Sequence, residues 1–412
     1  MKIAVVGSGI SGLSAAYYLS KKHKVDLFEK DDHFGGHSYT LDLNLNNKKI
    51  SVDIGFIVFN FQTYPNLINF FKENSIEIEK SNMSFSVSVK DSNFEYCGKG
   101  ISGMFCNKSN FFNLKFLKMF FDIIKFYKKN ETYQFSDNNF TLGDYLRKEQ
   151  LSKEFIDYHI IPMVAAIWSM PPYEASQMPL NFFLKFFQNH GLFKLKNRPQ
   201  WYTVKNRSRT YVNNILKKIS GEYYKNYRIN LIKRHKDNIE LCYGEKNEIF
   251  TYDKVIIATH ADEALSILEN PSEEEKKILS NFKYKKNIAI IHTDKEQMPK
   301  NTKAWSAWNA KLNKNARENS SVTYWLNLLQ NLQMEENIFL SLNPFDKIDE
   351  KKILKKIIFT HPYYDNLALE NQPKLKILQN VKNTLFCGSY FGYGFHEDGI
   401  TSSIDMLKYF ND

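Results

Sequence analysis

The chain has 412 residues, of which 43% are hydrophobic and 15% aromatic, and it carries a formal net charge of +11. The length predicts about two domains, and the composition excludes an intrinsically disordered chain. The basic residues are spread along the whole chain without an RNA- or DNA-binding motif, so we expect no nucleic-acid partner, although an attraction to anionic lipid or acidic substrates stays open.

The cysteines and the start of the chain bear on the compartment. The four cysteines form neither a CxxC pair nor a metal-ligating spacing, which favours a reducing cytoplasm. The first predicted strand follows Met1 almost directly, leaving no room for a signal peptide, and no apolar run is long enough to span a bilayer. We therefore expect a cytoplasmic protein whose membrane contact, if any, is peripheral and at the inner face.

The first 30 residues predict a βαβ unit. Residues 3–6 form an apolar strand, Gly7, Gly9 and Gly12 follow it, residues 10–19 form a helix, and a second strand ends on Glu29. In this motif the glycines allow a tight turn, a close approach of the backbone to a pyrophosphate and close packing of helix on strand. The N-terminus of the helix favours phosphate, and the terminal acid accepts a ribose hydroxyl and disfavours NADP. The unit therefore predicts a dinucleotide site.

A second glycine turn follows at Gly35 and Gly36, and residues 39–45 and 49–54 alternate as a hairpin. A Gly-Gly turn so soon after the ribose acid is typical of flavoproteins, where it walls the pyrophosphate and ribityl chain. We expect Asp53 to brace this loop, and Gly55 and Phe56 to lie near the flavin edge.

Residues 77–198 are predicted to be mainly helical and rich in aromatic residues. Within residues 111–129 one narrow helical stripe is formed by Lys115, Lys118, Asp122, Lys125 and Lys129, and aromatic and aliphatic residues cover the rest. Two interpretations remain open: a helix buried in a substrate domain with one wet edge, or a basic amphipathic helix that docks on lipid. Residues 182–193 suit a core or cavity wall first and a membrane face second.

Strands return in the second half of the chain. Residues 227–233, 239–243 and 249–252 predict a meander, residues 255–258 a buried strand, and residues 261–268 a helix. Further strands between residues 288 and 342 carry tryptophans. His292 and Asp294 have the spacing of one strand face and lack a third ligand, so no metal site is expected. Trp168, Trp305, Trp308 and Tyr393 are candidates for the substrate cavity.

The chain ends with a strand at 385–387, a turn at Gly388 and Ser389, and a helix that we expect to begin at Gly399. The N–H groups of Ile400 and Thr401 would then point toward a flavin carbonyl. The sequence thus predicts two helix N-termini that follow glycine loops, and a Gly-Gly turn beside them. These features suit FAD, which is an elongated cofactor, better than NAD. His396 and Glu397 are candidates for a catalytic base, although a histidine there more often fixes a turn.

Taken together, these residues resemble the flavin-containing amine oxidase-like superfamily. More narrowly, "AAIWSMPP" at 165–172, "IHTDKEQMP" at 291–299 and "GYGFHEDGI" at 392–400 resemble a bacterial family of predicted NAD/FAD-binding proteins. His37 stands where the superfamily generally has arginine, Ser389 stands where it commonly has an acid, and no residue matches the active-site lysine of true amine oxidases.

The resemblance implies an α/β fold: a Rossmann-like FAD-binding domain of the glutathione reductase/amine oxidase type, formed by residues 1–75, 205–285 and 375–412, with an inserted α+β substrate-binding domain at 76–204 and 286–374. It also implies non-covalent FAD. The residues expected at the cofactor are Gly7, Ser8, Gly9, Ile10, Ser11, Gly12, Glu29, Lys30, Gly36, His37, Ser38, Gly55, Phe56, Ile232, Ala258, Gly388, Ser389, Gly399 and Ile400.

The family is often found beside cyclopropane-fatty-acyl-synthase-like methyltransferases, which implies a lipid substrate and a possible methyltransferase partner. The sequence therefore predicts an FAD-dependent oxidoreductase that removes hydride from a hydrophobic substrate, most readily by desaturating a modified fatty acyl chain. Two alternatives are a redox-neutral double-bond isomerase and a flavin-bound module that presents lipid to the methyltransferase.

Overall fold

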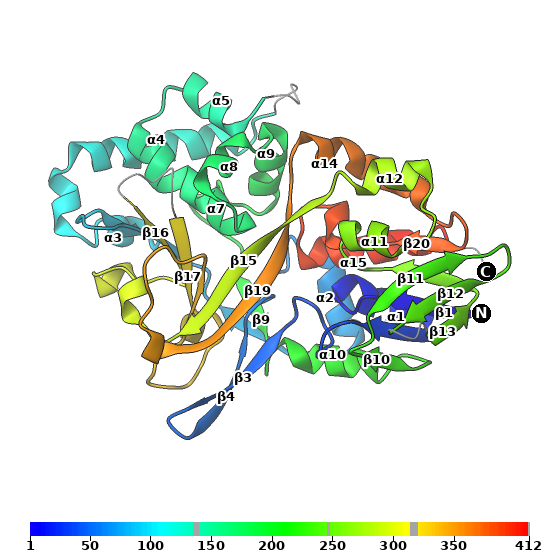
Figure 1. The fold of residues 1–412 in the computed structure, drawn as a ribbon. Helices are drawn as coiled ribbons and strands as arrows, with labels where there is room; N and C mark the ends of the chain where they lie inside the picture. Colours follow the sequence, from blue (N-terminus) through cyan, green and yellow to red (C-terminus); the bar gives the residue numbers. More distant parts are fainter. Residues whose placement is uncertain (135–139, 245–247, 314–319, 411–412) are drawn as a thin grey trace. The chain divides into compact units, whose positions relative to one another are not determined.

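The structure is a computed structural model that describes residues 1–134, 140–244, 248–313 and 320–410, and these residues form two compact units (Figure 1). The first unit comprises Met1–Glu79, Val204–Tyr284 and Pro362–Asp412, and the second comprises Lys80–Thr203 and Lys285–His361. The last segment of the first unit begins at Pro362 rather than at the predicted residue 375. The reason is that α14 (Asn366–Asn371) contributes Ala368 to the core of this unit.

A five-stranded parallel sheet organises the first unit. Its strands lie in the order β10-β2-β1-β14-β20 and have the bounds β10 Tyr223–Lys225, β2 Lys24–Glu29, β1 Lys2–Val6, β14 Lys254–Ile257 and β20 Thr384–Phe386. Ile3, Ala4 and Val5 are fully buried, because layers cover both faces of this sheet.

The two faces of this sheet are covered by different elements. Ala4 and Val6 of β1 belong to a core shared with a three-stranded meander and two helices: β11 (Ile229–Arg234), β12 (Ile239–Tyr243), β13 (Glu248–Tyr252), α11 (Ala261–Ile267) and α12 (Glu273–Leu279). On the other face α1 (Ile10–Leu19) contacts β1, and α15 (His396–Leu407) contacts β20. The predicted meander and the strand and helix after it are thus confirmed.

The predicted hairpin is also present, as β3 (Thr40–Leu45) and β4 (Lys48–Asp53). Its turn residues Asn46 and Asn47 have φ values of 49° and 62°, as a two-residue type I′ turn requires. Two further helices complete the part of the first unit that matters for the site, α2 (Pro65–Glu73) and α10 (Ser208–Leu216).

The second unit contains a mixed seven-stranded sheet in the order β19-β15-β18-β17-β16-β7-β8. The bounds are β19 Ile353–Tyr363, β15 Lys283–His292, β18 Phe339–Leu342, β17 Ser320–Trp325, β16 Trp308–Leu312, β7 Phe85–Val89 and β8 Glu95–Cys97. The prediction of helix from residue 77 onward was therefore wrong for its first 20 or so residues. The alternation in Phe-Ser-Val-Ser-Val at β7 is a strand signal that the sequence analysis missed.

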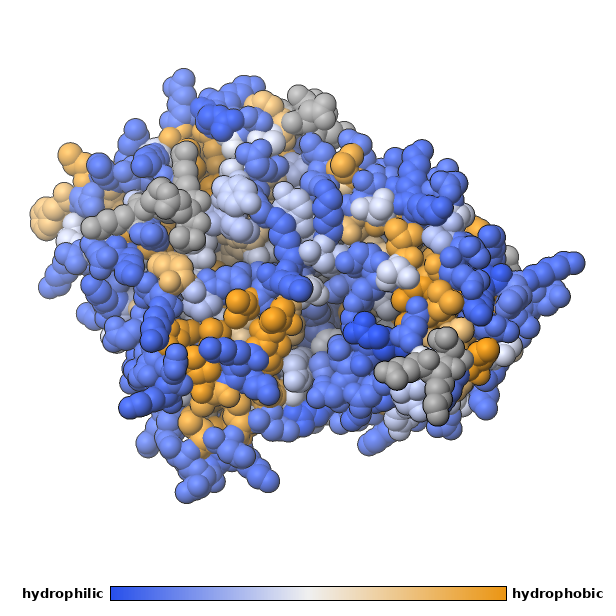
Figure 2. Space-filling view, in the orientation of Figure 1, coloured by the Kyte–Doolittle hydropathy of each residue, from blue (hydrophilic) through white to orange (hydrophobic). Residues whose placement is uncertain are grey.

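Helices form much of the rest of this unit, among them α3 (Gly100–Met104), α4 (Leu114–Asn130), α5 (Leu142–Lys148), α7 (Ile161–Trp168), α8 (Pro172–Gln177) and α9 (Leu180–Asn189). Phe182, Phe183, Phe186 and Phe187 of α9 are buried, which confirms the core interpretation of that segment. Helix α4 buries a face of Phe116, Met119, Ile123, Phe126 and Tyr127. Its Phe121, however, is 64% exposed. The face of the molecule shown in Figure 2 is largely hydrophilic, with separate hydrophobic patches.

Candidate functional site

The first glycine loop connects β1 to α1. The N–H group of Gly7 donates to the Phe28 carbonyl over 2.8 Å, which fixes the loop against β2. A Cβ added to Gly12 would lie 1.8 Å from the Gly7 carbonyl oxygen. Helix α1 therefore rests directly on the loop backbone, and only glycine fits at position 12.

The N-terminus of α1 is open. Its N-cap residue, Gly9, has no side chain to accept a hydrogen bond, and its first turn holds no acidic residue. A Cβ added to Gly9 would meet no heavy atom within 4 Å. The N–H groups of this turn and the positive end of the helix dipole thus face a space in which an anion is favoured.

Glu29 is fixed beside this loop at the end of β2. Its side chain is 5% exposed, and one carboxylate oxygen accepts hydrogen bonds from the Ser8 hydroxyl and, at 3.0 Å, from the Ser8 N–H group. The Ser8 hydroxyl in turn accepts the Gly35 N–H at 3.0 Å. Glu29, Ser8 and the second glycine turn therefore form one connected site. Lys30 points elsewhere, because its ammonium group pairs with Glu263 of α11.

The second glycine turn meets the first. Gly36 has φ +56°, and a Cβ added to it would lie 3.1 Å from the Cα of Gly9. The carbonyl oxygen of His37 accepts the Phe56 N–H at 2.7 Å, and a Cβ at Gly55 would lie 2.1 Å from that same oxygen. The structure therefore brings Gly9, Gly36, His37, Gly55 and Phe56 together, while their contact with a cofactor stays a prediction.

Helix α15 brings a second N-terminus to this site. A Cβ added to Gly399 would lie 2.7 Å from Ile10 Cγ2 and 2.8 Å from Ser11 Oγ, so the first turns of α15 and α1 pack against each other. The helix begins at His396, however, three residues before the predicted start. Ile400 is therefore its fifth residue, and the N–H groups of Ile400 and Thr401 belong to the hydrogen bonds of the helix rather than to its free first turn, so the prediction that they act as free donors was wrong.

The remaining predicted cofactor residues flank this site or brace it. The Ala258 N–H donates to the Val6 carbonyl over 2.8 Å, and the Gly388 N–H donates to Ser402 Oγ over 2.9 Å. The carbonyl of Ser389 accepts N–H groups from Gly392 and Gly394. The Ile232 side chain is fully buried in the meander core, which leaves only its backbone as a candidate contact.

His396 lies in a cluster that the sequence did not reveal. Its Nε2 is 2.8 Å from Ser38 Oγ and 3.3 Å from the Tyr211 hydroxyl, and its ring stacks on Phe56 at 3.7 Å. Burial lowers the pKa of His396 to about 3. These contacts favour a neutral, positioning histidine, while its catalytic role stays a prediction. Tyr211, on α10, had no local signal in the sequence.

Glu397 likewise has a structural task. Its two carboxylate oxygens accept the N–H groups of Asn66 and Leu67, each at 2.9 Å, at the start of α2. Burial raises the pKa of Glu397, and these hydrogen bonds lower it in part. The arrangement caps α2, and the predicted role of Glu397 as a base stays a prediction.

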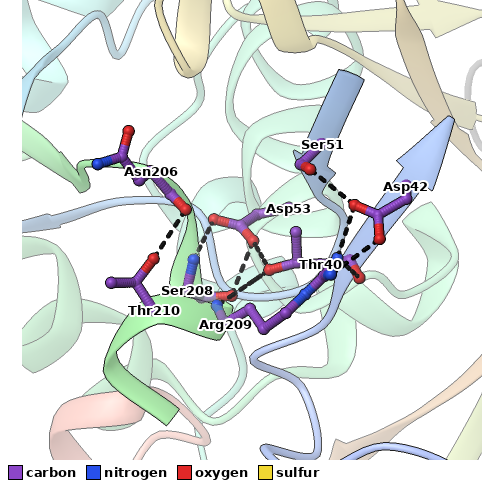
Figure 3. Close-up of polar contacts among 8 residues, drawn as sticks. All are labelled: Thr40, Asp42, Ser51, Asp53, Asn206, Ser208, Arg209 and Thr210. Atoms are coloured by element: carbon purple, nitrogen blue, oxygen red, sulfur yellow. Dashed lines mark hydrogen bonds and ion pairs between the residues drawn. The ribbon is translucent and has the colours of Figure 1, made fainter. Parts of the chain in front are cut away.

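Asp53 braces the hairpin, as expected (Figure 3). Its carboxylate accepts hydrogen bonds from Thr40 Oγ1 at 2.6 Å and from the N–H and hydroxyl groups of Ser208 at 2.8 Å each. Arg209 pairs with Asp42 beside it. Because Ser208 begins α10, this network ties the hairpin to the helix that carries Tyr211.

Asp398, at the third position of α15, was not singled out in the sequence. Its carboxylate accepts the Phe395 N–H at 2.8 Å, and burial raises its pKa from 3.8 to about 6. The folded protein thus binds this proton more tightly than the unfolded chain does, so the Asp398 contribution to stability is greatest below pH 3.8 and is lost as the pH rises through about 6.

We expect Asp398→Asn, which keeps an acceptor for the Phe395 N–H, to remove this loss. From acid to neutral pH, the free energy of unfolding of the variant should therefore rise by roughly 3 kcal/mol relative to that of the natural chain. Urea titrations across that range check this. A wild-type-minus-variant difference that does not change with pH would contradict it.

The tryptophans proposed for the cavity divide into separate groups. Trp305 contacts Trp325 edge-on at 5.4 Å, Trp308 contacts Tyr324 at 4.8 Å, and Trp168 packs against Phe186 at 4.6 Å. All of these lie in the second unit, whereas Tyr393 belongs to the first. Among the described residues the buried Trp308 indole N–H has no acceptor, which makes it a candidate donor to a ligand.

No helix in the described part of the chain is both long enough and apolar enough to cross a bilayer.

Comparisons of the sequence with known proteins match only parts of the chain. Residues 5–73 match the family model of an NAD(P)-binding Rossmann-like domain. Human prenylcysteine oxidase 1 is 33% identical over 99 residues, a match that covers 20% of this chain and 19% of that protein. The chain therefore spans about a fifth of the length of this curated relative, in which the match is confined to one segment.

Solved structures match over the full chain. The CLA-producing fatty acid isomerase from P. acnes has a TM-score of 0.70 at 14% identity and covers 100% of this chain and 98% of its own. Cyclohexylamine oxidase from Brevibacterium oxydans IH-35A has a TM-score of 0.65 at 14% identity and covers 99% of this chain and 98% of its own. These likenesses confirm the predicted mixed α/β fold of the amine oxidase type, with its Rossmann-like domain.

Proposed function

We propose that the protein is an FAD-dependent oxidoreductase that removes hydride from a hydrophobic substrate, oxidising or desaturating a fatty acyl chain. The observation that carries the proposal is the open space at Gly9, bounded by the uncapped N-terminus of α1 and by Gly36. Glu29 lies beside it, linked through Ser8. This arrangement supplies N–H donors for a pyrophosphate and a carboxylate for a ribose.

Two features favour FAD over a nicotinamide dinucleotide. The second glycine turn closes against the first, and the start of α15 packs against the start of α1. A cofactor that extends past the pyrophosphate would be bordered by both elements. Ser38, Phe56 and His396 form one hydrogen-bonded and stacked group next to them, which would fix the loop walls.

When bound, FAD supplies the capacity to accept a hydride from a C–H bond. The chain's own contribution is binding and orientation. The α1 N–H groups would hold the pyrophosphate, and Glu29 would accept hydrogen bonds from the ribose hydroxyl groups. The N–H groups of the first turn of α15 would stabilise negative charge near the cofactor.

A hydrophobic substrate is supported by the aromatic groups of the second unit. Trp305 packs edge-on against both Trp325 and Phe339, and Trp308 carries an indole N–H without an acceptor in the described residues. Aromatic side chains suit an apolar chain, and an indole N–H suits a polar end. The resemblance of the whole fold to a fatty acid isomerase supports the same substrate class.

The first test is the anaerobic visible spectrum of the purified protein, before and after addition of a bacterial lipid extract. We expect flavin absorption bands that bleach when the lipid is added, because hydride removal reduces the cofactor. Bands that persist over unchanged lipid would contradict the oxidoreductase proposal. A colourless protein that also fails to bind added FAD would contradict the cofactor.

A redox-neutral isomerase is the second candidate, and the likeness to a fatty acid isomerase is the observation that favours it. Product mass separates the two reactions, because oxidation removes two hydrogens from the substrate and isomerisation removes none. A lipid-presenting partner of a fatty-acyl methyltransferase is the third candidate, and it predicts lipid binding with neither change.

A further inference from the structure

An apolar surface ringed by lysines lies on the second unit. Its apolar members come from α3, from the 3₁₀ helix η1 (Lys108–Phe112) and from α4. Their exposed fractions are 71% for Ile101, 54% for Phe111, 89% for Phe112, 81% for Leu114 and 64% for Phe121. We call these five residues the apolar tip. In Figure 2 hydrophobic side chains are visible at the left of the view, over the segment that joins α3 to α4 in Figure 1.

Aromatic contacts connect two members of the tip, Phe111 and Phe121, through Phe105 and Phe120. The Phe105 ring stacks on Phe111 at 4.3 Å and contacts Phe120 at 5.5 Å, and Phe120 contacts Phe121 at 5.7 Å. Phe121 on α4 and Phe111 on η1 are therefore the exposed ends of one aromatic cluster.

The tip is also held in place by caps. Asn107 accepts the Ser109 N–H at the start of η1, and Asn113 accepts the N–H groups of Lys115 and Phe116 at the start of α4. The apolar side chains are thus presented by a fixed backbone, and exposing them costs free energy unless something covers them.

The charge of the surrounding surface indicates which kind of partner would cover them. Residues 99–129 contain seven lysines and one acidic residue, Asp122. Asp122 is engaged with the Ser152 N–H at 2.8 Å. Lys108, Lys118, Lys125 and Lys128 are exposed, and the outward side of α4 changes from apolar at Leu114 to basic at Lys118 and Lys125. Exposed aromatic side chains bordered by lysines match a bilayer surface whose headgroups are anionic.

We propose that the apolar tip inserts into the interfacial region of an anionic lipid bilayer, with the surrounding lysines at the headgroups. This inference does not depend on the proposed reaction. The exposed side of α4 would then contact lipid, while the opposite side packs in the core of the second unit.

Co-sedimentation of the full chain with vesicles tests the proposal. We expect binding to mixed phosphatidylcholine–phosphatidylglycerol vesicles and little binding to pure phosphatidylcholine. In the double variant Phe112→Ser/Leu114→Ser the partition coefficient should fall at least about tenfold, because two apolar contacts with the lipid are lost. In Lys118→Gln/Lys125→Gln it should fall about tenfold, and added salt should weaken binding of the natural chain in the same direction.

Matched controls are Ile249→Ser, at another exposed isoleucine (56% exposed), and Lys276→Gln/Lys277→Gln on α12. Both should bind like the natural chain, and circular dichroism verifies that all variants fold. Equal binding by the tip variants would overturn the proposal, as would no binding by the natural chain. A dimer that Phe112→Ser/Leu114→Ser converts to monomer, without vesicle binding, would show instead that a second copy covers the tip.

Discussion

Replacing Gly9 by aspartate is expected to weaken flavin binding strongly in a protein that stays folded. The position has no heavy atom within 4 Å of an added Cβ, so the side chain enters open space. Its carboxylate would take the N–H groups of the α1 first turn, as an N-cap aspartate does, and would repel a pyrophosphate. We expect FAD affinity to fall by at least about a hundredfold, measured by absorbance ratio and FAD titration.

Two further variants serve as controls for the Gly9→Asp result. Gly98→Asp, on the second unit, places the same charge where the nearest atom is 3.6 Å away, and it should leave flavin content unchanged. Gly12→Ala forces a Cβ to within 1.8 Å of the Gly7 carbonyl oxygen, so it should disrupt the fold of the first unit along with flavin binding. A Gly9→Asp protein that keeps a full complement of flavin would refute the assignment of this loop.

Replacing Arg234 by methionine is expected to destabilise the first unit by about 3–5 kcal/mol. The Arg234 and Glu275 side chains are 4% and 1% exposed, and they form a two-pronged ion pair of 2.5 and 3.0 Å. Burial alone would raise the pKa of Glu275, but hydrogen bonds from Arg234 and Ser272 hold it below its usual value. Removing the arginine leaves a buried carboxylate without its counter-charge.

Urea unfolding followed by circular dichroism measures this loss. The control is Lys276→Met, which breaks the exposed pair of Lys276 with Glu273 on the same helix, and its effect should stay within about 0.5 kcal/mol. The double variant Arg234→Met/Glu275→Leu should recover much of the stability, because neither charge then remains buried. A single Arg234→Met change no larger than the control's would contradict this account.

The sequence was most informative where function depends on short-range backbone geometry. Gly7, Gly9, Gly12 and Glu29 lie within one βαβ unit, and their spacing predicted a loop, a helix start and an acid that the structure places together. It was least informative at the end of the chain, where the helix begins at His396 because the Asp398 carboxylate accepts the Phe395 N–H. A glycine at position 399 looked like a helix start and instead serves close packing on Ile10.

By itself, then, the amino-acid sequence determined the elements whose geometry is local: the glycine loop, the hairpin turn at Asn46 and Asn47, and the buried strand predicted at 255–258, which the structure has at Lys254–Ile257. Only the tertiary structure decided which distant side chains meet. Ser38 forms a hydrogen bond with His396, which lies 358 residues later in the chain. Phe121 is an apolar residue of an amphipathic helix and is nevertheless exposed. The reason is physical: a turn or cap is selected by the residues that form it, whereas contacts and exposure depend on which elements pack against one another.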